Sequence, residues 1–134
     1  MITFDTSGLL AYMATQSRHY EVVRKTVDAD PGPYYIPVGA LAEMTFMIER
    51  DFPPGVEDAF VADLTEGSYS PYWEARDLAR IQELMRRYSD LPLGFADAAI
   101  VTCAERHGGR VITLDRRHFD VVARGEGTIT VVPT

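Results

Sequence analysis

The sequence predicts an α/β domain, a three-layer α/β/α sandwich in which helices cover both faces of a mainly parallel central sheet. The first observation is that short apolar runs alternate with segments of helical periodicity along the whole chain. The second is that no internal repeat, low-complexity tract or linker interrupts the 134 residues, so we expect one domain over residues 1–134. The third is the composition, 46% hydrophobic and 25% charged, which is typical of a globular protein.

Five short segments have the residue types of strands. They are ITF at 2–4, YYIP at 34–37, SYSPY at 68–72, RVITL at 110–114 and TITVV at 128–132. The segment 68–72 is expected to be an edge strand. Because helices separate these runs, we expect neighbouring strands to pair in parallel.

Helical segments fill the intervals between the strands. The segment 6–14 begins with a Thr–Ser pair and follows the first strand directly. The segment 19–30 is stopped by Pro–Gly–Pro, and the segment 38–52 by Pro–Pro–Gly. Further helices are expected at 56–67, 73–90, 94–109 and 116–123, of which 94–109 ends in a glycine pair. The helix over 73–90 is amphipathic, with Trp73, Leu78, Ile81, Leu84 and Met85 on or near one face.

Charge and composition exclude several classes of protein. The net charge is −7, whereas a protein that coats nucleic acid is usually basic, so a broad phosphate-binding surface is not expected. The single cysteine, Cys103, allows neither an internal disulfide nor a zinc cluster. No apolar run approaches the ~20 residues of a membrane span, and the first residues do not resemble a signal peptide. From these features we expect a cytoplasmic protein that makes no membrane contact.

Two acidic residues follow predicted strands directly. Asp5 ends the first strand and Asp115 ends the strand at 110–114. In open α/β sheets, ligands bind in the crevice beyond the carboxyl ends of the strands, so both side chains would face one crevice if the two strands are neighbours. The alternative, that each caps the helix that follows it, has about equal weight for either residue alone.

Two further acids lie on predicted helices among apolar neighbours. Glu43 is spaced with Ala40 and Met47, and Asp97 is spaced with Leu93 and Ile100, which places both acids on inward faces. A buried carboxylate needs a partner or a cation, and no basic residue is placed to pair with all four acids. Four converging carboxylates are instead a set of ligands for a hard divalent ion such as Mg²⁺. A bound ion would also explain how a protein of negative net charge could bind an RNA phosphate, because the ion supplies the positive charge.

The segments FDTSGL, LAEMTF and GFADAAIVTCAERHGGRVITLDRRHF resemble the PIN-domain ribonucleases, and in particular the VapC toxins of prokaryotic toxin–antitoxin pairs. The resemblance extends over nearly the whole chain. It implies that Asp5, Glu43, Asp97 and Asp115 form a catalytic quartet that binds Mg²⁺, or Mn²⁺, and that the protein hydrolyses RNA. It also implies a cognate VapB-type antitoxin and a homodimer, with Ser7 and Thr113 as hydroxyl residues that help to hold the site.

Several residues near the quartet have two interpretations. Arg116 and Arg117 directly follow Asp115 and would contact an RNA phosphate at the crevice mouth, or they are simply solvent-facing. His118 is close enough in sequence to reach the crevice, although a surface or packing role is more common. A rival from another class is a non-catalytic binding module whose acids hold an arginine of a partner. Cleavage of RNA with magnesium, stopped by EDTA, discriminates between enzyme and module.

Overall fold

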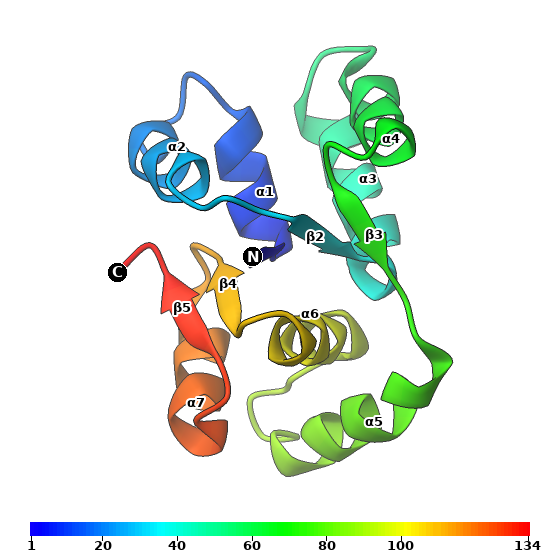
Figure 1. The fold of residues 1–134 in the computed structure, drawn as a ribbon, viewed down its shortest axis with the longest axis vertical. Helices are drawn as coiled ribbons and strands as arrows, with labels where there is room; N and C mark the ends of the chain where they lie inside the picture. The colour runs from blue at the N-terminus through cyan, green and yellow to red at the C-terminus, as the bar shows by residue number, and fades with distance from the viewer.

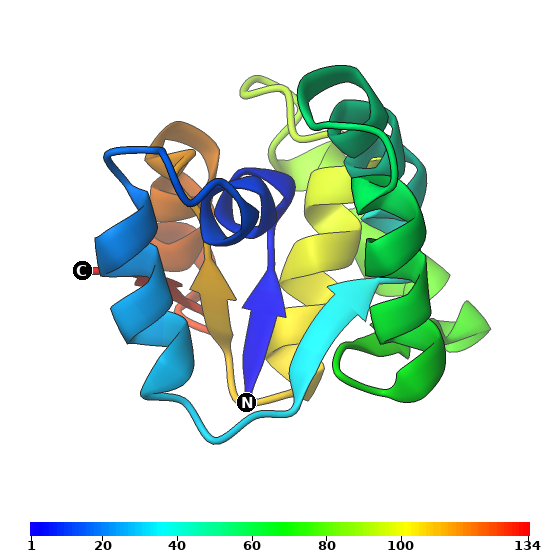
Figure 2. The same ribbon diagram turned by 90° about the horizontal axis from the view of Figure 1, so that it is seen from above.

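Five parallel strands form the central sheet, in the order β3-β2-β1-β4-β5. The computed structural model describes all residues from Met1 to Thr134. The strands are β1 (Ile2–Phe4), β2 (Tyr34–Pro37), β3 (Ser70–Tyr72), β4 (Arg110–Ile112) and β5 (Thr130–Val132). All five predicted strands are present, and β3 is an edge strand as expected. In Figure 2 the arrows of β4, β1 and β2 point the same way, so their carboxyl ends lie at one edge of the sheet.

Helices cover both faces of this sheet, which confirms the predicted α/β architecture. The helices are α1 (Thr6–Met13), α2 (Tyr20–Asp28), α3 (Leu41–Asp51), α4 (Val56–Glu66), α5 (Leu78–Arg87), α6 (Phe95–Arg106) and α7 (Arg116–Glu126). Short 3₁₀ turns, η1 (Val38–Ala40) and η2 (Ala75–Asp77), precede α3 and α5. Figure 1 shows α1 to α4 on one side of the sheet and α5 to α7 on the other.

The connections create a switch point between β1 and β4. From β1 the chain proceeds outward through β2 to β3, and after β3 it crosses to β4 and continues outward to β5. The two halves of the sheet therefore diverge from the β1–β4 pair, where Thr3 lies beside Val111 and Phe4 beside Ile112. A crevice outside the carboxyl ends of strands is expected at such a point. Asp5 directly follows β1, whereas Asp115 lies three residues past β4, because this strand ends at Ile112 rather than at residue 114 as predicted.

Two glycines allow the close packing around this switch point. A Cβ atom on Gly8 of α1 would lie 2.1 Å from the carbonyl oxygen of Ile112, so α1 rests directly on the backbone at the end of β4. A Cβ atom on Gly39 of η1 would lie 2.8 Å from the Cβ of Ala99, which brings η1 against α6. The first contact fixes the position of Ser7 relative to Thr113, and the second fixes α3 relative to Asp97.

The apolar face predicted for the segment 73–90 is partly wrong. The helix begins at Leu78 rather than at residue 73, and its buried residues are Ile81 and Leu84. Trp73 is 47% exposed and Leu78 is 45% exposed, so neither belongs to the core. Trp73 lies before η2, outside the helical repeat on which its placement depended.

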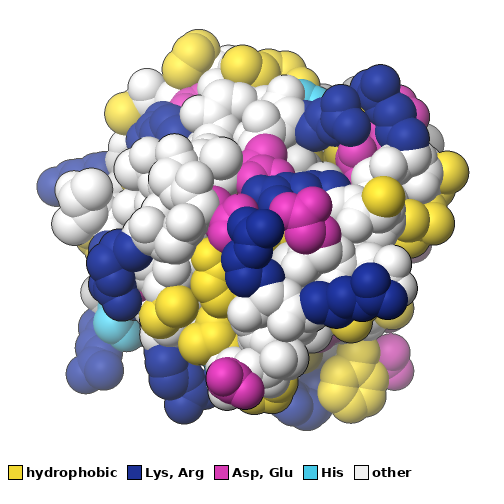
Figure 3. Space-filling view, turned by 90° about the horizontal axis from the view of Figure 1, so that it is seen from below, with side chains coloured by type: hydrophobic (Ala, Val, Ile, Leu, Met, Phe, Trp, Pro, Cys, Tyr) yellow, Lys and Arg dark blue, Asp and Glu magenta, His cyan; other side chains and the backbone are white.

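A network of ion pairs joins α5, α6 and α7 on the face of the molecule seen in Figure 3, where acidic and arginine side chains interleave. Glu126, whose side chain is only 5% exposed, pairs with Arg80 at 2.9 Å and Arg87 at 2.7 Å, and accepts a hydrogen bond from Tyr88 at 2.6 Å. Arg80 also pairs with Glu105 on α6 at 2.6 Å. Burial favours the neutral acid, but the hydrogen bonds from Tyr88, Arg87 and Arg80 outweigh this effect and lower the pKa of Glu126 to about 2.

No helix has the length and apolarity needed to cross a membrane.

Candidate active site

The carboxylate of Asp5 is buried at the carboxyl end of β1. Its residue is 5% exposed, and its Oδ2 accepts hydrogen bonds from the hydroxyl of Ser7 at 2.8 Å and from that of Thr113 at 2.6 Å. Asp5 occupies the N-cap position of α1, but its side chain makes no capping hydrogen bond to the helix. Both hydroxyls thus donate to the same oxygen of this carboxylate.

The same two hydroxyls hold the end of β4. The backbone N–H of Leu114 donates to Ser7 Oγ at 2.9 Å, and the N–H of Asp115 donates to Thr113 Oγ1 at 2.9 Å. Ser7 and Thr113 therefore connect Asp5 to the segment that carries Asp115. The sequence resemblance placed both hydroxyl residues at the site, and their hydrogen bonds to Asp5 give that placement a physical basis.

Asp97 and Asp115 face each other across His118. The Nδ1 atom of His118 lies 3.7 Å from Oδ2 of Asp97 and 3.5 Å from Oδ2 of Asp115. This nitrogen is buried and has no hydrogen-bond partner. Asp115, like Asp5, makes no capping bond to the helix that follows. His118 is thus a site residue, although its position in the sequence favoured a surface or packing role.

Glu43 reaches the site from the first turn of α3. The prediction that it lies on the buried face is wrong, because Glu43 is exposed and the buried positions of α3 are Met44 and Ile48. Partial desolvation of its carboxyl group and the nearby negative charge of Asp5 nevertheless raise its pKa. Thr6 Oγ1 is buried and lacks a hydrogen-bond partner.

The four acids lie near enough to one another for their charges to interact, because Asp5, Glu43 and Asp115 all raise the pKa of Asp97. The pKa of Asp97 is raised to about 6, and desolvation is the largest cause. The negative charge of Asp5 adds to the rise, and Glu43 and Asp115 add smaller increments. The nearby His118 opposes the rise. Desolvation also raises the pKa of Asp5, against hydrogen bonds from Thr113 and Ser7 that lower it. Such mutual perturbation of carboxyl groups in a crevice is typical of functional sites.

The donor set suits a hard divalent cation. It consists of carboxylate oxygens, and the buried, unpartnered Thr6 Oγ1 and His118 Nδ1 mark polar positions that the protein leaves unsatisfied. No group of three or more histidine, cysteine or acidic side chains has the geometry to hold a metal ion. Magnesium does not require such a group, because it commonly takes only one or two carboxylates and retains water for the rest.

The two arginines after Asp115 differ in their freedom to bind a ligand. Arg116 pairs with Asp120 at 3.1 Å and donates to the carbonyl of Pro133 at 2.8 Å. Arg117 is exposed and makes no ion pair or hydrogen bond. Of the two, only Arg117 is available to a phosphate without loss of an existing contact.

Comparison with known proteins identifies the family of this chain. Residues 2–125 match the family model of the PIN domain. The chain is 30% identical over 136 aligned positions to ribonuclease VapC26 of Mycobacterium tuberculosis, and the alignment covers 96% of this chain and 98% of the relative.

Solved structures share the fold. The crystal structure of VapC20 of Mycobacterium tuberculosis, a sarcin–ricin loop cleaving toxin, superposes with a TM-score of 0.78 at 16% identity, covering 91% of this chain and 95% of that one. FitAcB from Neisseria gonorrhoeae superposes with a TM-score of 0.65 at 20% identity, covering 98% and 96% of the two chains. The fold, the match over residues 2–125 and the similarity to VapC26 establish that this chain belongs to the PIN-domain family, as a member of the VapC type.

Proposed function

We propose that this chain is a Mg²⁺-dependent endoribonuclease that hydrolyses phosphodiester bonds of RNA and acts as the toxin of a VapBC-type pair. The observation that supports the proposal is that Asp97 and Asp115 both lie beside His118, while burial and the charges of Asp5, Glu43 and Asp115 raise the pKa of Asp97 to about 6. The similarity to ribonuclease VapC26 supports RNA as the substrate.

In this proposal Asp5, Asp97 and Asp115 hold the metal directly or through water, and Glu43 holds it or orients the attacking water. Bound Mg²⁺ or Mn²⁺ supplies positive charge that polarises a phosphoryl oxygen and lowers the pKa of a bound water. The hydroxyls of Ser7 and Thr113 keep Asp5 oriented, since each donates a hydrogen bond to its Oδ2.

An antitoxin and a second copy of the chain are the proposed partners. An antitoxin arginine that enters the acidic crevice would replace the metal charge through charge-assisted hydrogen bonds. The structural relatives FitAcB and FitAB bound to a DNA fragment support a complex of this general kind. We propose that the toxin acts in the cytoplasm, where its RNA substrate is found, and that it forms a homodimer.

The test is cleavage of RNA by the purified chain. We expect cleavage with Mg²⁺ or Mn²⁺, none with EDTA, and none by the Asp5→Asn variant. Asp90→Asn is the matched control, because Asp90 is exposed and makes no ion pair or hydrogen bond. Sequencing the 5′ ends of the fragments would identify the target. A chain that binds an antitoxin but never cuts RNA would instead be the non-catalytic module.

A further inference from the structure

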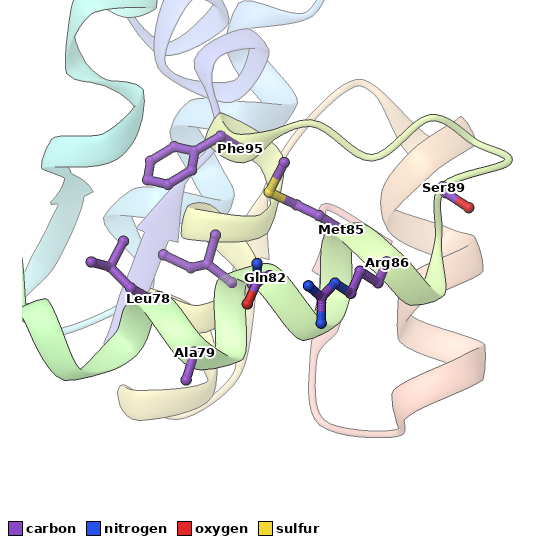
Figure 4. Close-up of a pocket in the computed structure, with 8 residues that line it drawn as sticks. Leu78, Ala79, Gln82, Met85, Arg86, Ser89 and Phe95 are labelled. Atoms are coloured by element: carbon purple, nitrogen blue, oxygen red, sulfur yellow. The ribbon is translucent and has the colours of Figure 1, made fainter.

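The four acids lie outside the cavity of about 620 Å³ that runs along α5. The walls of this cavity include Met85 and Phe95, and none of the four acids lines it (Figure 4). The positions of the carboxylates therefore depend on the side chains that contact them rather than on the shape of this cavity. Asp5 already has such contacts, because the hydroxyls of Ser7 and Thr113 donate to it.

The ring of His118 lies between two acids that reach the site from different elements. Asp97 belongs to the first turn of α6, and Asp115 precedes α7, whose first turn carries His118. The Nδ1 atom of the ring is 3.7 Å from Oδ2 of Asp97 and 3.5 Å from Oδ2 of Asp115. The side chain of His118 is only 15% exposed, so the ring is enclosed by protein rather than turned to solvent.

The Nδ1 atom of His118 lacks the hydrogen bond that its burial calls for. Only two buried side-chain nitrogen or oxygen atoms have no hydrogen-bond partner, and the other is Oγ1 of Thr6, the residue that follows Asp5. Folded proteins rarely leave such atoms unsatisfied, and a catalytic role or a bound water or ion explains many of the exceptions. Both exceptions in this chain lie beside the acids, where a role in the site would explain them.

The chemistry of the two neighbours makes the ring a hydrogen-bond donor. Ionised carboxylates accept hydrogen bonds and cannot donate them, so an Nδ1 atom with a carboxylate on either side carries a proton. Its two distances exceed that of an ordinary N–H···O bond by about 0.5 Å. Contacts of this kind tighten when a catalytic site binds its ligands. A small movement of either carboxylate would therefore complete a hydrogen bond from His118.

We propose that His118 is a positioning residue of the candidate site, whose Nδ1–H group holds the carboxylates of Asp97 and Asp115 in the orientation that binds the metal. The inference rests on the proposed function and adds a residue to it. It gives these two acids the kind of support that two hydroxyls already give to Asp5. Partners that orient metal ligands in this way typically contribute about 10- to 100-fold to metal affinity or activity.

Direct binding of the metal by Nδ1 of His118 is the rival interpretation. Two observations favour positioning instead. No group of three or more histidine, cysteine or acidic side chains has the geometry to hold a metal ion. Hard ions such as Mg²⁺ also prefer oxygen ligands to the nitrogen of an imidazole ring.

The test compares two amide substitutions in the full-length chain. The amide nitrogen of His118→Asn takes the place of Nδ1, whereas that of His118→Gln takes the place of Nε2. Neither amide titrates, and histidine and asparagine have similar helix propensities. Isothermal titration calorimetry gives the Kd of Mg²⁺ and of Mn²⁺ without RNA. We expect His118→Gln to raise the Kd about tenfold, and His118→Asn to stay within about threefold of the parent.

His19→Asn is the matched control, because the ring of His19 contacts Arg18 rather than an acid. Its Kd values should equal those of the parent. In RNA cleavage at limiting Mg²⁺, His118→Gln should lower kcat about tenfold, leave the KM for RNA unchanged and recover most of its rate as Mg²⁺ is raised. A ring that only packs α7 would instead lower the melting temperature of both His118 variants in EDTA.

The other outcomes overturn different statements. Equal Kd values in the parent and both His118 variants show that the ring does not position the acids. Loss of affinity in both variants also refutes positioning, and nitrogen hyperfine coupling in the Mn²⁺ spectrum of the parent then identifies the ring as a metal ligand. A parent chain that binds neither ion refutes the metal-dependent function and this inference with it. A chain that binds metal and loses affinity only in His118→Gln, but cuts no RNA, refutes the proposed function alone.

Discussion

Replacement of Asp97 by asparagine tests whether like charges meet at the candidate site. The pKa of Asp97 is raised from 3.8 to about 6, first by desolvation and then by the charge of Asp5. A rise of about two units corresponds to about 3 kcal/mol between the ionised and neutral forms. Its side chain is 25% exposed, and the amide of asparagine also loses some hydration. We therefore expect the free energy of unfolding to rise by about 1–2 kcal/mol in metal-free buffer at about pH 8.

The pH dependence follows from the direction of the shift. Because the folded-state pKa lies above that of the unfolded chain, protonation of Asp97 stabilises the fold. This contribution is complete below about pH 4 and is lost as the pH rises through about 6. The advantage of Asp97→Asn over the wild type should therefore grow between about pH 4 and about pH 6, be complete above about pH 6, and vanish below about pH 3, where the wild-type residue is neutral in both states.

Thermal melts in EDTA across this pH range provide the measurement. For a chain of this size the expected gain corresponds to a rise in Tm of roughly 4–8 °C at about pH 8. Asp90→Asn serves as control for the removal of one negative charge from an exposed position. A variant less stable than the wild type at about pH 8, or a difference that does not vary with pH, would refute the reasoning.

Three other substitutions probe separate features. Asp5→Asn should abolish RNA cleavage, leave the metal-free protein at least as stable, and reduce the rise in Tm caused by Mg²⁺; equal rises in both proteins would remove Asp5 from the metal site. Glu126→Gln should lower the free energy of unfolding by about 3 kcal/mol at neutral pH, measured with urea, because the pKa of Glu126 is lowered to about 2. That loss should shrink as the pH falls from about 4.5 through about 2, since the acid then becomes neutral in the wild type as well, and a pH-independent loss would contradict it. Gly8→Ala should cost about 3 kcal/mol or more, because the new Cβ would lie 2.1 Å from the carbonyl oxygen of Ile112; unchanged urea unfolding would disprove the close approach of α1 to β4.

Local patterns in the sequence were sufficient to predict the architecture. Short apolar runs separated by helices identify all five strands, and the tendency of such units to form parallel sheets gives the fold. The positions of Asp5 and Asp115 after two strands predict a crevice, provided that the two strands are neighbours. The structure supplies this condition, because β1 pairs with β4. The strand ends thus carried most of the information about the site.

Side-chain environment was harder to predict than position. Glu43 has apolar neighbours at helical spacing, but the buried face of α3 consists of Met44 and Ile48. Glu43 lies next to this face rather than on it. Periodicity defines a face only to within about one residue, since adjacent positions differ by about 100° around a helix. The contacts of Glu126 were inaccessible for another reason, because Arg80 and Arg87 lie far from it in the sequence and meet it only through tertiary packing.

The hydroxyl of Thr113 donates to a carboxylate 108 residues earlier in the chain. During synthesis from the N-terminus, Asp5 therefore leaves the ribosome long before the residues that orient it exist. The partial chain has its first acid but lacks both the strand that pairs beside it and the two acids of the C-terminal third. Any chemistry that requires all four must begin only when synthesis is nearly complete, so a prematurely terminated product would carry no assembled centre.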